Sequence, residues 1–122
     1  MLQVTALSKQ EAGLCPVRQV LSKVTGKWQV LLILALEDGA LRFGVLRRTI
    51  GDITQRVLTE NLRSLERDGY LTRTVDAGPP VAVFYELTPL GHQLLILLKP
   101  LVIWAGENHR DIAKSREAYD VI

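Results

Sequence analysis

The sequence has little of what metal and disulfide sites need. It contains one cysteine, Cys15, and two histidines, His92 and His109, among 122 residues. A single cysteine cannot form a disulfide within the chain or supply the thiolates of a structural zinc site, and the histidines belong to no metal-ligand motif. We therefore expect no metal, and the reducing cytosol suits such a chain.

Long hydrophobic runs and a strong net charge are also missing. The longest apolar runs, residues 30–36 and 94–98, fall well short of the ~20 residues of a spanning helix, and residues 1–10 lack the apolar core of a secretory signal. These absences predict a cytoplasmic protein with no membrane partner. The net charge is only +2, so a surface that attracts polyanions has to be local.

Enzyme motifs are absent as well. The sequence has no Gly-x-Ser-x-Gly elbow, no phosphate loop and no Cys/His pair with an orienting residue. We therefore expect no catalytic residue, no cofactor and no enzyme activity. What is present is an ordinary globular composition, 48% hydrophobic and 23% charged, at the length of one domain.

Helical patterns dominate the first half of the chain. The apolar spacing and the Gly and Pro punctuation predict helices from Pro16, over residues 27–37 and over residues 43–49, with a short extended piece at residues 40–42. The clearest helix spans residues 54–68. Its first residue, Thr54, can cap it, and Leu58, Leu62 and Leu65 form one apolar stripe.

The second half of the chain predicts a β-hairpin and a long helix. Turn formers separate two β-type runs, residues 70–75 and 81–87. Helix then resumes at Thr88 and Pro89 and runs to residue 104, with room to continue to residue 115, and Pro100 is expected to kink or break it.

This order of elements predicts an α+β, mainly helical fold, a winged helix-turn-helix with a C-terminal dimerisation helix. We expect one domain over residues 1–122, made of an N-terminal arm (1–14), a winged-helix core (15–88) and the dimerisation helix with its tail (89–122).

The outer face of the 54–68 helix carries side chains suited to reading DNA bases. An arginine can form two hydrogen bonds to the edge of one guanine, a glutamine can do the same with adenine, and a threonine methyl can contact the thymine methyl. The first residues of such a helix usually reach the bases. The candidates for base contact are Thr54, Gln55, Arg56, Thr59 and Arg63.

Positive charge is concentrated around this helix. Residues 42–73 contain seven arginines and four acidic residues, whereas the rest of the chain has one more acidic than basic residue. Arginine favours forked contacts to phosphates. The candidates for contact with the DNA backbone are Lys27, Arg42, Arg47, Arg48 and Arg73. The alternative is an ordinary solvated face on which Arg63 and Arg67 pair with Glu60 and Glu66.

The last helix is apolar nearly all round, although a helix on the surface of a small monomer needs only one apolar stripe. A second copy of the chain is the simplest cover, and two-fold symmetry would present two recognition helices to a palindromic double-stranded operator. The alternative is a helix enclosed within one monomer. The expected dimer contacts are Leu7, with Val4 nearby, and Leu94, Leu97, Leu98, Leu101 and Trp104.

Short motifs in a fixed order resemble the HxlR-type winged helix-turn-helix regulators of prokaryotes, relatives of the MarR group. They are Cys-Pro-Val at 15–17, Gly-Lys-Trp at 26–28, Gly-Ala-Leu-Arg-Phe at 39–43, Leu-Arg-Arg at 46–48, and the segments 53–59, 62–69 and 85–91. The resemblance implies a dimeric DNA-binding transcription factor that joins through its terminal helices and contacts DNA with the helix beginning at Thr54.

The same resemblance bears on Cys15, because in some such regulators the cysteine of the Cys-Pro-Val motif senses oxidants or electrophiles. A helix N-terminus would make this thiol more reactive. The alternative is a cysteine that simply packs as a small hydrophobic residue.

The wing departs from the family pattern. The family often carries an arginine just after the Pro-Pro of the wing, but here Val81 to Tyr85 follow Pro79 and Pro80 without a basic residue. Arg73 is the nearest substitute for a contact with the DNA backbone.

The alternative function is a winged helix that binds proteins and no nucleic acid. The sequence allows a small-molecule effector but names none.

Overall fold

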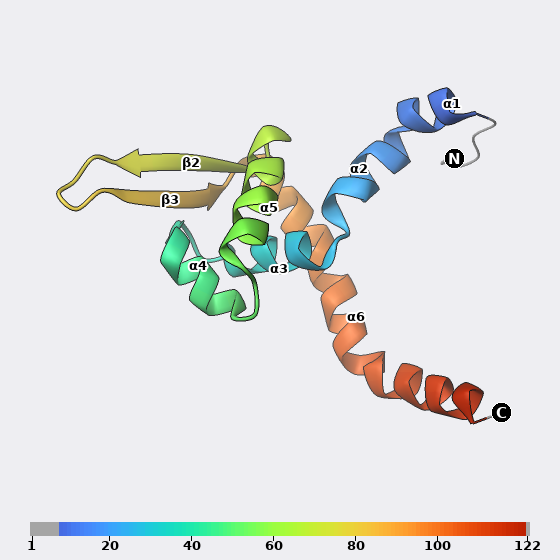
Figure 1. Ribbon diagram of the computed structural model, residues 1–122. Coiled ribbons are helices and arrows are strands. Elements are labelled where there is room, and N and C mark those ends of the chain that lie inside the picture. Colours follow the sequence, from blue (N-terminus) through green and yellow to red (C-terminus); the bar gives the residue numbers. More distant parts are fainter. Residues whose placement is uncertain (1–7, 122) are drawn as a thin grey trace.

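The computed structural model describes residues 8–121 and has the architecture of a winged helix. Its elements are α1 (Lys9–Leu14), α2 (Pro16–Val24), α3 (Lys27–Ala35), β1 (Leu41–Arg42), α4 (Phe43–Ile50), α5 (Gln55–Arg67), β2 (Leu71–Asp76), β3 (Ala82–Leu87) and α6 (Pro89–Asp120). Figure 1 shows α3, α4 and α5 together as a helical body, with the β2–β3 hairpin projecting on one side and α6 leaving on the other.

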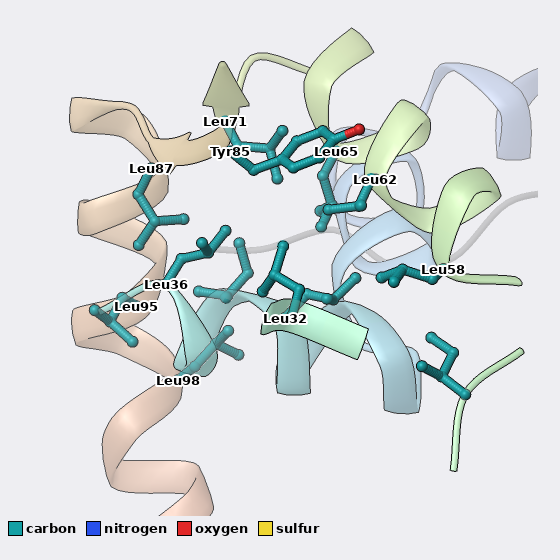
Figure 2. Packing of buried hydrophobic residues seen from close by; sticks show 13 residues of the cluster. Leu32, Leu36, Leu58, Leu62, Leu65, Leu71, Tyr85, Leu87, Leu95 and Leu98 are labelled. Atoms are coloured by element: carbon teal, nitrogen blue, oxygen red, sulfur yellow. The ribbon is translucent and has the colours of Figure 1, made fainter. Parts of the chain in front are cut away.

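The core forms where α3 and α5 meet. α3 is almost entirely apolar, and its Leu32 and the following residue Leu36 are fully buried. Leu58, Leu62 and Leu65 lie on one stripe of α5 and are buried against the same cluster. Figure 2 shows these leucines converging with Leu71, Tyr85 and Leu87 of the sheet and with Leu95 and Leu98 of α6. The stripe predicted from the sequence is therefore the buried face of α5, and the opposite face points outward.

The turn between α4 and α5 makes this pair a helix-turn-helix. Gly51 ends α4 with φ of 92°, a left-handed conformation that favours glycine, and Ile53 is buried in the turn. Thr54 caps α5, because its Oγ1 accepts a hydrogen bond from the Val57 backbone N–H at 3.2 Å. The start of α5 is thus fixed by the turn at Gly51 and by the Thr54 cap, and the cap is the one that the sequence predicted.

The sheet is small and antiparallel, with strand order β1-β3-β2. Leu71 pairs with Leu87 and Arg73 with Tyr85, while β1 places Arg42 opposite Phe84. Within β2 only Leu71 is buried. β3 is buried at Ala82, Tyr85 and Leu87, so the hairpin packs on the body through β3 and exposes β2 at its outer edge, as in a wing.

The first turn of α6 is fixed to the end of α5 by Thr88. Its hydroxyl donates to the Gly69 carbonyl at 2.6 Å and accepts from the Gly91 backbone N–H at 3.1 Å. Gly91 lies so close to the chain that a Cβ there would meet the Tyr70 carbonyl oxygen at 2.1 Å. Farther along, Lys99 forms an ion pair with Glu37 after α3.

Leu98, expected as a dimer contact, is only 6% exposed and belongs to the subunit's own core, so little of its side chain is left for a partner. Of the kink or break expected at Pro100, the break does not occur, since α6 continues to Asp120 and changes direction along its length (Figure 1). The helix α1 lies within the segment expected as the N-terminal arm. The expected contact at Leu7, with Val4 nearby, lies outside the described residues.

Replacing Thr88 with alanine should destabilise the fold by about 1–2 kcal/mol, because α6 loses its cap and the Gly69 carbonyl loses a donor. The free energy of unfolding from chemical denaturation measures the change. Thr88→Ser keeps the hydroxyl and should lie within about 0.5 kcal/mol of the parent. Equal losses in both variants would mean that the methyl group, rather than the hydroxyl, stabilises this junction.

Candidate nucleic-acid interface

The outer face of α5 brings together four of the five residues predicted to contact bases. Gln55, Arg56, Thr59 and Arg63 line one shallow depression of 480 Å³, and Glu60 completes its wall. The leucine stripe on the opposite side of α5 is buried, so this face is directed to solvent. This face carries hydrogen-bond donors from Gln and Arg, which are side chains that can bond base edges in a DNA major groove.

Thr54 and Thr59 use part of their hydrogen-bonding capacity within the helix. The Thr54 hydroxyl oxygen accepts from the Val57 N–H as the cap. The Thr59 hydroxyl donates to the Gln55 carbonyl at 2.8 Å. The hydroxyl proton of Thr59 is therefore occupied, and its methyl group is what remains for an apolar contact.

Arg56 pairs with Glu60 one turn later. The Arg56 Nε lies 3.0 Å from the Glu60 Oε1, and the two side chains are 86% and 58% exposed. A pair this exposed contributes about 0–1 kcal/mol, so it orients Arg56 without holding it. The sequence placed the pairing on Arg63 and Arg67 instead, because spacing allows each arginine of the helix several acidic neighbours and does not choose between them.

Three of the cations predicted to contact the DNA backbone flank α5. Arg47 and Arg48 are exposed in the last turn of α4. Lys27 begins α3, where its ammonium lies 3.8 Å from an Asp52 carboxylate oxygen and 4.2 Å from the centre of the Trp28 ring. The Lys27 side chain therefore spans the start of α3 and the α4–α5 turn.

The other two cations lie on the sheet. The Arg42 guanidinium lies 5.3 Å from the centre of the Phe84 ring, a cation–π distance. Arg73 is exposed on β2 opposite Tyr85. The aromatic support of Arg42 was missed in the sequence analysis because it depends on the pairing of β1 with β3, two strands forty residues apart in the chain.

The tip of the wing carries no cation. Residues 76–86 contain no lysine or arginine, and the Asp76 carboxylate accepts from the Gly78 N–H at 3.1 Å in the turn. Cationic side chains on the hairpin and its neighbouring strand are therefore found at the base of the wing, in Arg42 and Arg73.

α6 presents a second surface, which is apolar. Ile96, Leu97, Leu101, Ile103 and Trp104 are all more than half exposed, with Leu97 at 72%. By length and composition alone this helix could cross a membrane, since its most apolar 18 residues have a mean hydropathy of 1.2 and only 17% of them are buried. The core helix of a soluble protein can pass the same test. Leu95, Leu98 and the Lys99–Glu37 pair also attach one side of α6 to the body.

Leu94 and Cys15 lie in intermediate positions. Leu94 is half-buried against the subunit core, so less of it is available to a partner than of Leu97, Leu101 or Trp104.

Cys15 is half-buried at the N-cap of α2. Within residues 8–121 no three His, Cys, Asp or Glu side chains gather into a group that could hold a metal ion.

Comparison with known proteins supports the fold and places it among regulators. The HxlR-like helix-turn-helix family model matches residues 23–113. The HTH-type transcriptional regulator YtfH of Escherichia coli is 40% identical over 103 residues, which are 84% of this chain and 82% of YtfH. The structure of the putative transcriptional regulator ytfH from Salmonella typhimurium superposes with a TM-score of 0.79 at 40% identity, covering 87% of this chain and 95% of that one.

A further structural relative is named for redox regulation. The redox regulator HypR in its oxidized form is 39% identical, with a TM-score of 0.72 over 77% of this chain and 97% of HypR. This chain thus shares its fold with solved structures named as a putative transcriptional regulator and a redox regulator.

Proposed function

Because the chain belongs to the HxlR-like helix-turn-helix family of transcriptional regulators, we propose that it binds double-stranded DNA as a homodimer and reads an operator with α5. The observation that carries this proposal is the outer face of α5. Gln55, Arg56, Thr59 and Arg63 lie together there, while the apolar stripe of the same helix is buried. Cytoplasmic location and the absence of enzyme activity belong to the same proposal.

The proposed contacts divide into two kinds. Arg56 and Arg63 bond guanine edges, Gln55 bonds adenine and the Thr59 methyl contacts thymine, so these residues supply sequence preference. Arg47, Arg48 and Lys27 at the flanks, and Arg42 and Arg73 at the base of the wing, contact phosphates and position the helix in the groove. Thr54 fixes the start of α5 and contributes mainly through its cap.

The homodimer follows from the exposed side of α6. Leaving Leu97, Leu101 and Trp104 in water is unfavourable by ~25 cal/mol for each Å² of apolar surface. A lipid bilayer would cover the same side chains, but the opposite side of the helix is already packed on the body through Leu95 and Leu98. The α6 of a second copy would cover only the exposed side and would leave the packed side in place. The two-fold axis then gives two copies of α5 and a palindromic operator.

Arg56→Ala should reduce the preference for the operator over a scrambled duplex by ~5- to 150-fold, because a paired contact to a base contributes ~1–3 kcal/mol of discrimination. Arg48→Ala should weaken binding to both duplexes about equally and make the dependence of the logarithm of affinity on the logarithm of salt concentration less steep. Fluorescence anisotropy across a salt series measures both effects.

Two results would contradict this assignment. Unchanged discrimination in Arg56→Ala would remove Arg56 from base reading. A parent protein that binds no duplex even in dilute salt would favour the alternative of a protein-interaction module.

Leu97→Glu combined with Leu101→Glu should convert the protein to monomers, because the interface would then bury unpaired charges. Sedimentation velocity measures the change in mass, and circular dichroism checks that the helices remain. Thr74→Glu, which adds one negative charge at an exposed position of β2 away from α6, is the control and should leave the dimer intact. A parent that sediments as a monomer would contradict the proposed assembly.

A redox response through Cys15 is a second proposal, favoured by two observations. Cys15 lies half-buried at the start of α2, and a structural relative is named as a redox regulator. Diamide accepts the two electrons and two protons that are released when the Cys15 thiol and a glutathione thiol join in a mixed disulfide. The added glutathionyl group would occupy space at the start of α2 and so displace α1 relative to α2.

Treatment with diamide and glutathione should change the operator affinity of the parent by at least about 10-fold and leave Cys15→Ser unchanged. Anisotropy before and after treatment, followed by reduction with dithiothreitol, measures the effect and its reversal. Mass spectrometry confirms the adduct. An adduct that leaves the affinity unchanged would end the sensing proposal, and so would an equal response in both proteins.

A further inference from the structure

A pair of half-buried amide side chains joins α3 to α5. The Gln29 Nε2 donates to the Asn61 Oδ1, and the Asn61 Nδ2 donates in turn to the Val57 carbonyl of its own helix at 2.8 Å. Gln29 and Asn61 are thirty-two residues apart in the chain, and both are partly buried. We call this chain of hydrogen bonds the Gln29–Asn61 clasp.

Gly26 provides the space for the clasp. A Cβ built on Gly26 would lie 2.0 Å from the Gln29 Oε1, so the amide occupies the place where any other residue would have a side chain. Gly26 is also the residue that precedes α3, where its φ of −67° would suit most amino acids. Glycine at this position therefore leaves room for the Gln29 amide, which a side chain at residue 26 would displace.

The clasp restricts the rotation of α5 about its own axis, which the leucine stripe does not. Apolar burial of Leu58, Leu62 and Leu65 holds α5 against α3, but such burial is non-directional and tolerates small rotations of a helix about its axis. Hydrogen bonds have narrow ranges of distance and angle, so the clasp tolerates much less rotation. Asn61 lies at the edge of the buried stripe, one turn after Val57 and one turn before Leu65.

Small rotations of α5 matter at its outer face. Arg56 and Arg63 lie on the side of the helix away from the stripe, at a radius of about 5–6 Å from the helix axis or more. A rotation of about 20° moves a group at that radius by about 2 Å. Paired hydrogen bonds to a base edge do not survive a displacement of this size, since their distance range is only about 0.5 Å wide.

We propose that the Gln29–Asn61 clasp is a positioning device that fixes the rotation of the recognition helix and thereby the base preference of Arg56 and Arg63. Gln29 and Asn61 touch no base. They act through the orientation of α5, and this role rests on the proposed DNA-binding function.

The test separates positioning from stability. Gln29→Leu together with Asn61→Leu replaces both amides by apolar side chains of similar size, an exchange that leaves no buried donor or acceptor without its partner at this contact and can be nearly neutral for stability. The exchanged pair, Gln29→Asn with Asn61→Gln, keeps one amide on each helix and the total number of methylenes. Asn61→Leu alone leaves the Gln29 amide without its partner, so this variant measures how much stability and discrimination are lost when the clasp is broken.

The DNA probe is a duplex that the parent protein selects from a random-sequence library, compared with the same duplex carrying scrambled half-sites. Affinities for both, measured by anisotropy in the same salt, give a discrimination ratio for each variant. Urea denaturation and sedimentation velocity establish that each variant is folded and has the assembly of the parent.

The double leucine variant should remain folded, keep its affinity for the scrambled duplex within about twofold, and lose at least about 10-fold in discrimination. The exchanged pair should regain most of that loss. Parent-like discrimination in a folded double leucine variant would overturn the positioning role. If that variant fails to fold, Asn61→Leu alone decides: a folded Asn61→Leu protein with parent-like discrimination overturns the positioning role, and a loss of discrimination with retained affinity for the scrambled duplex supports it. A parent that selects no sequence would overturn the proposed function itself.

Discussion

The burial of one leucine stripe on α5 is the constraint on which the rest of the structure depends. Leu58, Leu62 and Leu65 are fully or almost fully buried in the same cluster as Leu32 of α3 and Leu36, the residue that follows α3. Burying a leucine side chain contributes about 1.5–3 kcal/mol, so turning this helix over would cost about 5–9 kcal/mol for the three leucines, which is comparable to the whole stability of a small domain. The stripe therefore decides which face of α5 meets solvent, and the polar residues of that face follow from the helical period.

Leucines alone leave the exact orientation of α5 undetermined, and polar contacts refine it. The Thr54 cap fixes where the helix begins, and the Gln29–Asn61 clasp joins it to α3 by directional bonds. Near the other end, Thr88 bonds Gly69 and starts α6. The Thr88 hydroxyl thus connects the residues that follow α5 to α6, the helix proposed to form the dimer.

Local patterns were enough to predict the limits of α5, its Thr54 cap and the hairpin, because each depends on residues close together in the sequence. The failures concern residues whose partners are distant. α6 is apolar nearly all round, so its sequence could not show that Leu98 faces the core while Leu97 is exposed. The contact of Arg42 with Phe84 and that of Gln29 with Asn61 likewise require a tertiary arrangement that periodicity does not contain. The sequence did not choose between a kink and a break at Pro100, and α6 continues through this residue to Asp120.

Methylation protection by dimethyl sulfate on the selected duplex reports on the placement of α5, because this reagent attacks guanine N7 in the major groove, where arginine is proposed to bond. We expect protected guanines in two symmetric half-sites whose centres lie about one helical turn, 10–10.5 base pairs, or a whole multiple of it apart. A bound duplex in which every guanine N7 remains reactive would contradict this placement, since the protein would then hold DNA without placing α5 in the major groove.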